Sequence, residues 1–206
     1  MTDKIVEQKT DAGTEEIRRF AVGSLAVYPA HGVGIIEAIE SKVVNGERHD
    51  FYIMRVLDND MLIMIPTWNV DSVGLRDIIG ESEIPKVYEV IRHRQQTTSE
   101  TQTWNRRYRD YMDKIRKGSL YDVAEVFRDL SILKLTKDLS FGERKLYDIA
   151  QILLVKELST ARDIEEEKIL KEIESFFVDD KPPEPGDSPK KQSGDKDDSK
   201  HDADDD

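Results

Sequence analysis

The sequence contains no cysteine, which excludes disulfide bonds, thiolate chemistry and zinc fingers. No apolar run approaches the roughly 18 residues that a membrane-spanning helix requires. The first 19 residues also lack the central apolar stretch of a secretory signal. Together these absences predict a cytoplasmic protein with no membrane partner.

Motifs for catalysis and for nucleotide or metal binding are absent as well. The four histidines are scattered and have no ligand spacing. The zinc-protease pattern HExxH, the phosphate-binding pattern GxxxxGK[ST] and the nucleophile pattern GxSxG do not occur. Gly32-Val33-Gly34 lacks the third glycine of a dinucleotide-binding loop. We therefore predict no enzyme, no cofactor and no metal site.

Basic residues are the minority among the charges, 31 against 43 acidic ones, and the formal net charge is −12. Residues 179–206 alone carry 11 acids and 5 bases and hold no large apolar side chain. With nothing to bury, this tail is expected to be disordered. Two interpretations remain open: a solubilising tail, or a competitor for a basic surface that weakens nucleic-acid binding.

From Phe20 to about Leu75 the pattern favours short strands. Apolar segments at 25–28, 35–39, 51–57 and 61–65 are separated by turn residues. Asn45-Gly46 is the strongest hairpin signal, because both residues tolerate a positive φ. About five strands in so short a segment predict a small, strongly bent antiparallel sheet or barrel.

After Gly74 the apolar period becomes helical. One face of a first helix holds Ile84, Val87, Tyr88 and Ile91, and a polar linker follows at 94–102. A second helix runs from Trp104 to Gly118 and a third starts at Ser119. The sequence Ser140-Phe-Gly-Glu143 is a capping box that opens a fourth helix, and the fifth covers Thr160–Phe177.

The expected fold is therefore α+β, with an N-terminal antiparallel β module and a compact C-terminal module of about five helices. We expect a disordered N-terminal extension at 1–19, a β domain at 20–78, a helical domain at 79–178 and the acidic tail at 179–206.

The second predicted helix gathers positive charge around aromatic residues. Residues 103–117 contain six basic and two acidic side chains, a net charge of +4 in a strongly acidic chain. Trp104 and Tyr108 lie on the same helical stripe as Ile115, so the tryptophan is either the first core residue or the edge of a polyanion-binding patch. Phosphates would bind the basic residues, and the ring could stack on a base. Residues 134–145 either extend the patch through Arg144 and Lys145 or form an ordinary mixed-charge surface.

Several of these segments resemble the CarD/CdnL family of bacterial RNA-polymerase-binding transcription regulators. The resemblance covers residues 20–177 and is carried by VYPAHGVG (27–34), MIP (64–66), SVGLRDII (72–79), TWNRRYRDYMDKI (103–115), AEVFRDL (124–130) and LSFGERK (139–145). Similarity in the N-terminal part alone would instead have indicated the polymerase-interaction module of transcription–repair coupling factors.

The resemblance implies a Tudor-like β module that binds the β subunit of RNA polymerase, and a helical module that contacts promoter DNA. The implied DNA contacts are Trp104 as a wedge at the upstream edge of the bubble and Arg106 on the DNA backbone, then Arg107, Arg109 and Met112. Arg144 and Lys145 join the predicted DNA contacts on the charge pattern alone. The implied polymerase contacts are Ile53, Met54, Met64 and Pro66. From the sequence alone, Ile53 and Met64 are equally plausible as core residues.

The expected function is stabilisation of the promoter open complex, without strong sequence specificity, by a monomer that joins the nucleoid through polymerase. The alternative is an adaptor of RNA polymerase that makes no direct DNA contact.

Overall fold

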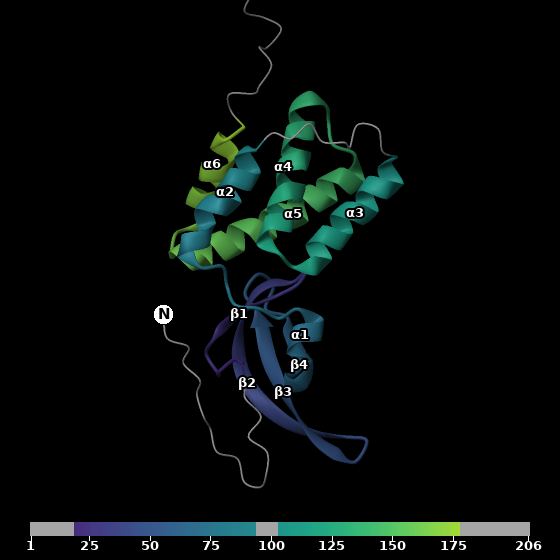
Figure 1. Ribbon diagram of the computed structural model, residues 1–206, viewed down its shortest axis with the longest axis vertical. Coiled ribbons are helices and arrows are strands. Elements are labelled where there is room, and N and C mark those ends of the chain that lie inside the picture. Colours follow the sequence, from purple (N-terminus) through teal and green to yellow (C-terminus); the bar gives the residue numbers. More distant parts are fainter. Residues whose placement is uncertain (1–18, 94–102, 178–206) are drawn as a thin grey trace, which may run out of the picture.

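The computed structural model describes residues 19–93 and 103–177, so residues 1–18 of the predicted extension, the linker and the tail lie outside the described residues. Arg19, predicted as the last residue of the extension, is described and forms an ion pair with Asp71 at 2.8 Å. A four-stranded antiparallel sheet is followed by a helical module, which confirms the α+β prediction (Figure 1). Among the described residues, no helix has the length and apolar character to cross a bilayer. The strands are β1 (Leu25–Tyr28), β2 (Gly32–Val44), β3 (Glu47–Val56) and β4 (Leu62–Pro66).

The sheet has the order β1-β2-β3-β4, and all neighbours are antiparallel. At the β2–β3 turn, Asn45 and Gly46 have φ angles of 53° and 87°, as the predicted hairpin requires. A register shift between Ile36 and Ala38 bends the sheet. One face covers a core that includes Tyr52 and the buried side chains Phe20, Ala26, Ile36, Met54, Ile65, Val70 and Leu75.

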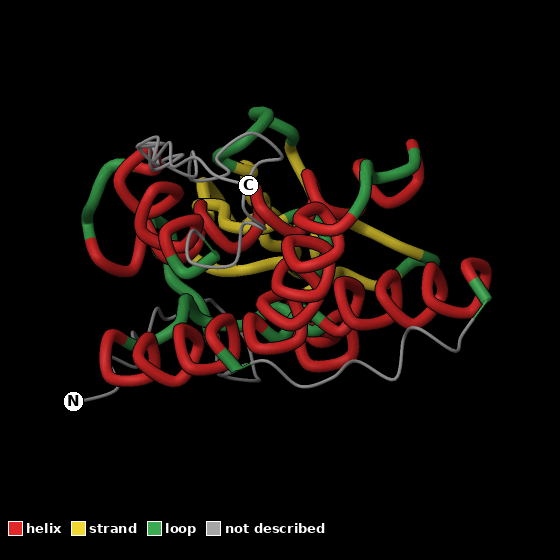
Figure 2. Tube along the Cα trace, turned by 90° about the horizontal axis from the view of Figure 1, so that it is seen from above, coloured by secondary structure: helices red, strands yellow, loops and turns green. Residues whose placement is uncertain are grey.

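The helices pack around a separate core above the sheet (Figure 1). Seen from above, they lie in front of the strands (Figure 2). The helices around this core are α2 (Ile84–Arg92), α3 (Trp104–Lys117), α4 (Leu120–Thr136), α5 (Phe141–Arg162) and α6 (Glu166–Ser175), with a 3-10 turn at Glu81–Glu83 before α2. The short helix α1 (Val70–Val73) and the 3-10 turn at Thr67–Asn69 follow β4, and α1 packs on the core under the sheet. Helix α4 packs against α2, α3 and α5. The predicted start of the last helix at Thr160 is too early, because α5 continues to Arg162. Asp163 then ends that helix with a φ of 53°.

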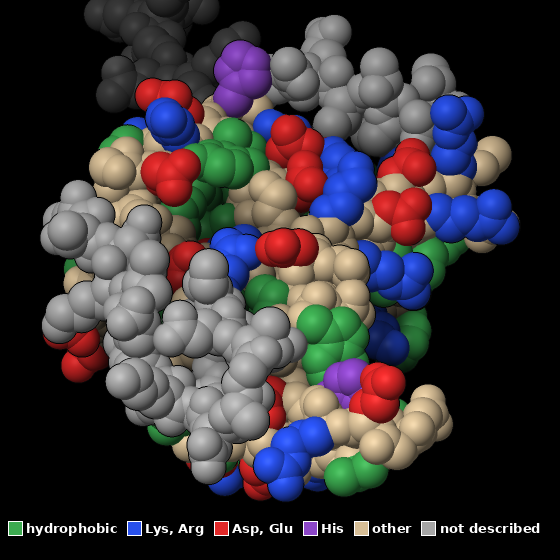
Figure 3. All heavy atoms as spheres, turned by 60° about the horizontal axis from the view of Figure 1, so that its bottom comes forward, with side chains coloured by type: hydrophobic (Ala, Val, Ile, Leu, Met, Phe, Trp, Pro, Cys, Tyr) green, Lys and Arg blue, Asp and Glu red, His purple; other side chains and the backbone are tan. Residues whose placement is uncertain are grey.

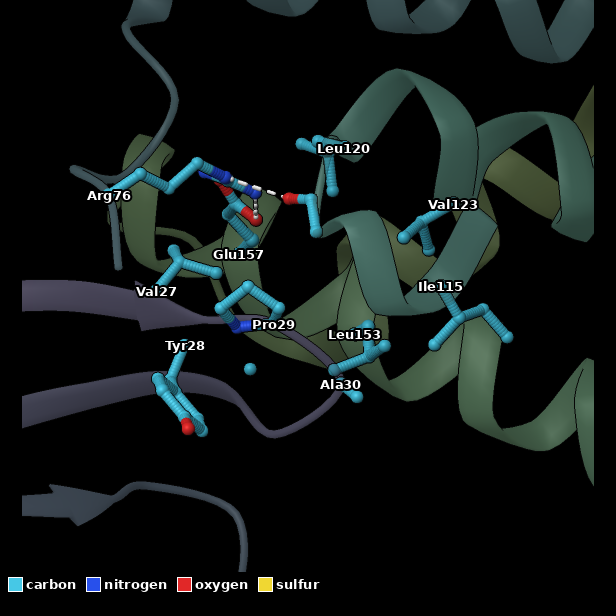
Figure 4. A pocket seen from close by; sticks show the side chains of 12 residues that line it. Val27, Tyr28, Pro29, Ala30, Arg76, Ile115, Leu120, Val123, Leu153 and Glu157 are labelled. Atoms are coloured by element: carbon cyan, nitrogen blue, oxygen red, sulfur yellow. Dashed lines mark hydrogen bonds and ion pairs between the residues drawn. The ribbon is translucent and has the colours of Figure 1, made fainter. Parts of the chain in front are cut away.

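A polar junction joins the sheet to the helices (Figure 4). The Arg76 guanidinium donates to both carboxylate oxygens of Glu157 at 2.6 and 2.8 Å, and its Nε donates to the Gly118 carbonyl oxygen at 2.8 Å. Gly118 ends α3 with a φ of 75°, and a Cβ there would lie 2.7 Å from Pro29 Cγ. The turn after β1 therefore fits directly under the α3–α4 turn, and the orientation of α3 is fixed relative to the sheet.

Candidate nucleic-acid interface

Helix α3 presents one side to the helical core and one side to solvent. Tyr111 and Ile115 are buried, whereas Trp104 and Met112 are only partly buried against the same core. Burial, together with the nearby Asp129 carboxylate, raises the pKa of Tyr111, so its hydroxyl stays neutral. Trp104 therefore packs its ring on the edge of the core and keeps an exposed part, while Tyr108 on the same stripe is 37% exposed.

The basic side chains of α3 fall into two groups. Arg107 is 17% exposed and places Nη2 3.6 Å from Glu143 Oε1, while Lys114 is 2.6 Å from Glu125 Oε2. By contrast, Arg106, Arg109, Arg116 and Lys117 are exposed and form no ion pair with any other described residue. The sequence of α3 alone could not show which of its basic side chains are paired, because the neutralising acids Glu125 and Glu143 lie on α4 and α5.

The start of α5 meets the start of α3. Glu143 is 2% exposed and completes the predicted capping box: its carboxylate accepts from the Ser140 amide at 2.9 Å, and the Glu143 amide donates to Ser140 Oγ at 3.4 Å. Lys137 Nζ is 3.1 Å from Glu143 Oε1. Burial alone would raise the pKa of Glu143, but the hydrogen bonds from Ser140 and Lys137 outweigh it and hold that pKa below its ordinary value.

The first turn of α5 also exposes residues to solvent. Arg144 and Lys145 are exposed and, like Arg106, have no ion-pair partner among the described residues. Phe141, the first residue of α5, is 87% exposed, the largest exposed fraction among the large apolar side chains described. Sequence reasoning missed Phe141, although the capping box places it in the first helical turn, outside the core-facing stripe of α5.

Trp104, Arg107, Glu143 and Phe141 therefore come from the first turns of α3 and α5, segments far apart in the sequence. We call this corner, with the exposed bases Arg106, Arg109, Arg144 and Lys145, the aromatic–basic corner. An aromatic ring beside unpaired cations can stack on a base while the cations neutralise phosphates. On the face shown in Figure 3, acidic and basic side chains mix, and basic ones gather toward one edge.

The predicted polymerase contacts lie on β3 and β4. Ile53 and Met64 are directly opposite each other, and Pro66 pairs with Phe51, so these side chains share the outer face of the sheet. Met64 is 45% exposed. Met54 is different: alternation along β3 turns it inward, and it is 0% exposed, so its predicted surface role is wrong.

This outer face continues beyond β4. Trp68 is 53% exposed, and its ring centroid lies 4.5 Å from that of His49 and 5.3 Å from that of Phe51. Strand β4 is at the edge of the sheet, with only β3 as a neighbour in the described part of the chain. We call Phe51, Ile53, Met64, Pro66 and Trp68 the outer apolar face; the sequence prediction included neither Phe51 nor Trp68.

Comparisons with known proteins match both halves of the chain. Residues 20–79 match the CarD-like/TRCF RID domain, and residues 86–174 match the CarD C-terminal domain. The chain is 35% identical over 157 residues to the putative transcription factor YdeB of Bacillus subtilis (strain 168), covering 76% of this chain and 99% of that relative. A solved structure, CdnLNt from Myxococcus xanthus, is 50% identical, covers 34% of this chain and 97% of its own, and has a TM-score of 0.27. The chain therefore belongs to the CarD/CdnL family of RNA-polymerase-binding transcription regulators.

Proposed function

We propose that this protein binds the β subunit of RNA polymerase through its outer apolar face and stabilises the promoter open complex through its aromatic–basic corner. In this proposal Trp104 contacts DNA at the upstream edge of the bubble, and the exposed arginine and lysine side chains contact the DNA backbone. The protein acts as a monomer, without a catalytic step, and reaches the nucleoid by binding polymerase.

The observation that carries the DNA contact is the position of Trp104. Its ring is partly exposed in the first turn of α3 and packs against Gly142 in the first turn of α5. The same two helices carry the exposed side chains Arg106, Arg109, Arg144 and Lys145. Exposed arginine and lysine suit the phosphate backbone and give little sequence preference. An aromatic ring at the edge of such a patch can stack on, or wedge beside, a base that has lost its pairing partner. Phe141 adds a second exposed ring to the same corner.

The physical basis is differential affinity. A contact formed only with the opened junction stabilises the open state relative to the closed one. A difference of about 1.4 kcal/mol would shift this equilibrium tenfold. A corner with so few cationic side chains binds DNA only weakly by itself. The β module must therefore hold the corner near the promoter, which raises the effective concentration of the corner at the DNA.

The polymerase contact rests on the outer apolar face. Ile53, Met64 and Trp68 place apolar surface next to the free edge of β4. An edge strand offers unpaired backbone groups to a partner strand, and neighbouring apolar side chains add burial. Met54 supports this face from inside and makes no contact of its own.

Replacing the ring tests the proposal. Trp104→Ala is expected to leave polymerase affinity unchanged and to shorten the lifetime of the open complex by about tenfold. Polymerase affinity, measured on the same variant, is the control for folding and docking. An unchanged lifetime would remove the wedge role.

A second candidate function is an adaptor that meets an acidic protein partner instead of DNA. The observation in its favour is that Arg107 and Lys114 are already paired with acids, which reduces the charge available for phosphates. Site-specific crosslinking from position 104 or 106 in a promoter complex separates the two functions. A crosslink to DNA supports the wedge, and crosslinks to protein alone support the adaptor.

A further inference from the structure

We propose that Gly142 is a positioning residue for Trp104: because position 142 has no side chain, the indole ring can pack directly on the first turn of α5. We call this packing surface at Gly142 the seat. The functional consequence rests on the proposed role of Trp104 in the open complex. The seat itself is a structural claim and can be tested without polymerase.

The seat is defined by the distances from Gly142 to the ring. A Cβ built on Gly142 would lie 2.7 Å from Trp104 Cζ2, 3.5 Å from Cη2 and 3.6 Å from Cε2. These three atoms form one edge of the six-membered ring. The first distance is well below van der Waals contact between two carbon atoms. Any other residue at position 142 would therefore push this edge of the ring away from α5.

The backbone gives no other reason for glycine at this position. Gly142 is the second residue of α5, and it is not among the glycines with positive φ. Alanine would fit the same helical backbone and would favour the helix by up to about 1 kcal/mol. The close approach of Trp104 is what a larger residue would disturb.

The other sides of the ring are held as well. The Tyr108 ring centroid lies 5.6 Å from that of Trp104, and the Arg107 guanidinium carbon lies 6.0 Å from the Trp104 centroid. Arg107 is in turn held by Glu143, the residue that follows the seat. The first turn of α5 thus supplies Gly142, on which the ring packs, and Glu143, which holds Arg107 beside the ring. A ring fixed in advance loses less conformational entropy when it meets DNA.

Gly142→Ala separates positioning from the presence of the ring. We expect unchanged or higher thermal stability, together with an open-complex lifetime shortened by up to about tenfold, toward that of Trp104→Ala. In a Trp68→Phe background Trp104 is the one remaining tryptophan, since the sequence has two, and its acrylamide quenching is expected to change when position 142 becomes alanine. The matched control is Gly80→Ala, because a Cβ on Gly80 meets no atom closer than 3.9 Å.

A double variant completes the test. When Trp104 is already alanine, Gly142→Ala is expected to leave the lifetime unchanged, because no ring remains to displace. If Gly142→Ala unfolds the protein, the smaller ring of Trp104→Phe should restore folding, and failure to restore it overturns the seat. Unchanged quenching in Gly142→Ala also overturns it. If Trp104→Ala itself has no effect on lifetime, the proposed function fails, and quenching alone then decides for or against the seat.

Discussion

Arg76 and Glu157 form a bidentate ion pair across 81 positions of the sequence, and it joins the end of the β module to the middle of α5. The Glu157 side chain is 3% exposed. Its Oε1 also accepts from the Ile79 amide at 3.1 Å. One carboxylate therefore holds both the guanidinium and the chain that crosses from sheet to helices.

Glu157→Ala is expected to lower the free energy of unfolding by about 3 kcal/mol, because it leaves Arg76 and the Ile79 amide without their partner. Chemical denaturation measures this loss. Glu167→Ala is the control: Glu167 pairs with Lys171 at 2.7 Å, but both side chains are more than 70% exposed. We expect that change to cost less than about 0.5 kcal/mol. Equal effects of the two substitutions would contradict a structural role for the junction.

Glu143 is expected to make stability depend on pH in the acid range. Its folded-state pKa lies below the ordinary value of a glutamate, so the carboxylate stabilises the folded state above that ordinary value, and the contribution is lost as pH falls through the folded pKa. Glu143→Gln should therefore lower the unfolding free energy by about 1–2 kcal/mol at pH 7, and the difference from wild type should shrink under acid conditions. Denaturation curves at several pH values check this.

The control for this titration is Glu167→Gln on the exposed side of α6. We expect its effect on the unfolding free energy to be small throughout, since the Glu167–Lys171 pair is exposed to solvent. A Glu143→Gln penalty that stays constant into the acid range would show that hydrogen-bond geometry, and not the charge, gives Glu143 its role.

Met54 and Met64 should separate folding from polymerase binding. Met64→Glu places a charge on the outer apolar face and is expected to weaken polymerase binding at least about tenfold, with little change in stability. Met54→Ala opens a cavity in the core and should cost about 2–5 kcal/mol of stability. Val43→Glu, at a site 71% exposed near the hairpin end, is the control and should bind polymerase normally. Normal binding by Met64→Glu would move the docking surface elsewhere.

The acidic tail is expected to compete with DNA for the aromatic–basic corner. Deleting residues 179–206 removes a net charge of −6. The affinity of the free protein for DNA should then rise several-fold at low salt, and the gain should disappear as salt screens the charges. A full-length variant with neutral tail residues should behave like the deletion. Equal affinities at every salt concentration would leave the tail with a solubilising role.

The sequence was sufficient for features that depend on local chemistry. The Asn45-Gly46 hairpin, the Ser140–Glu143 capping box and the end of α3 at Gly118 all appear as predicted. Each depends on residues within a few positions of one another, where backbone preference and short hydrogen bonds decide the outcome.

Features that depend on distant residues could not be predicted in this way. Met54 and Met64 are both apolar strand residues, and only the register of the sheet decides which of them faces the core. From the sequence, Arg107 is one of six similar basic side chains. Only the packing of α3 against α5 places Glu143 beside it. Likewise, nothing in the local sequence around Gly142 indicates that the ring of Trp104 rests on it.

The polar junction also bears on how the protein would select its DNA target. Because Pro29 fits under Gly118 and Arg76 is locked to Glu157, the separation between β4 and Trp104 is a property of the fold and not of a linker. Under the proposed function, the fold sets the separation between the polymerase-binding face and the DNA contact. Held by polymerase at one end, the molecule touches DNA at one fixed distance, and it can discriminate between promoters by where each one opens, without recognising a single base.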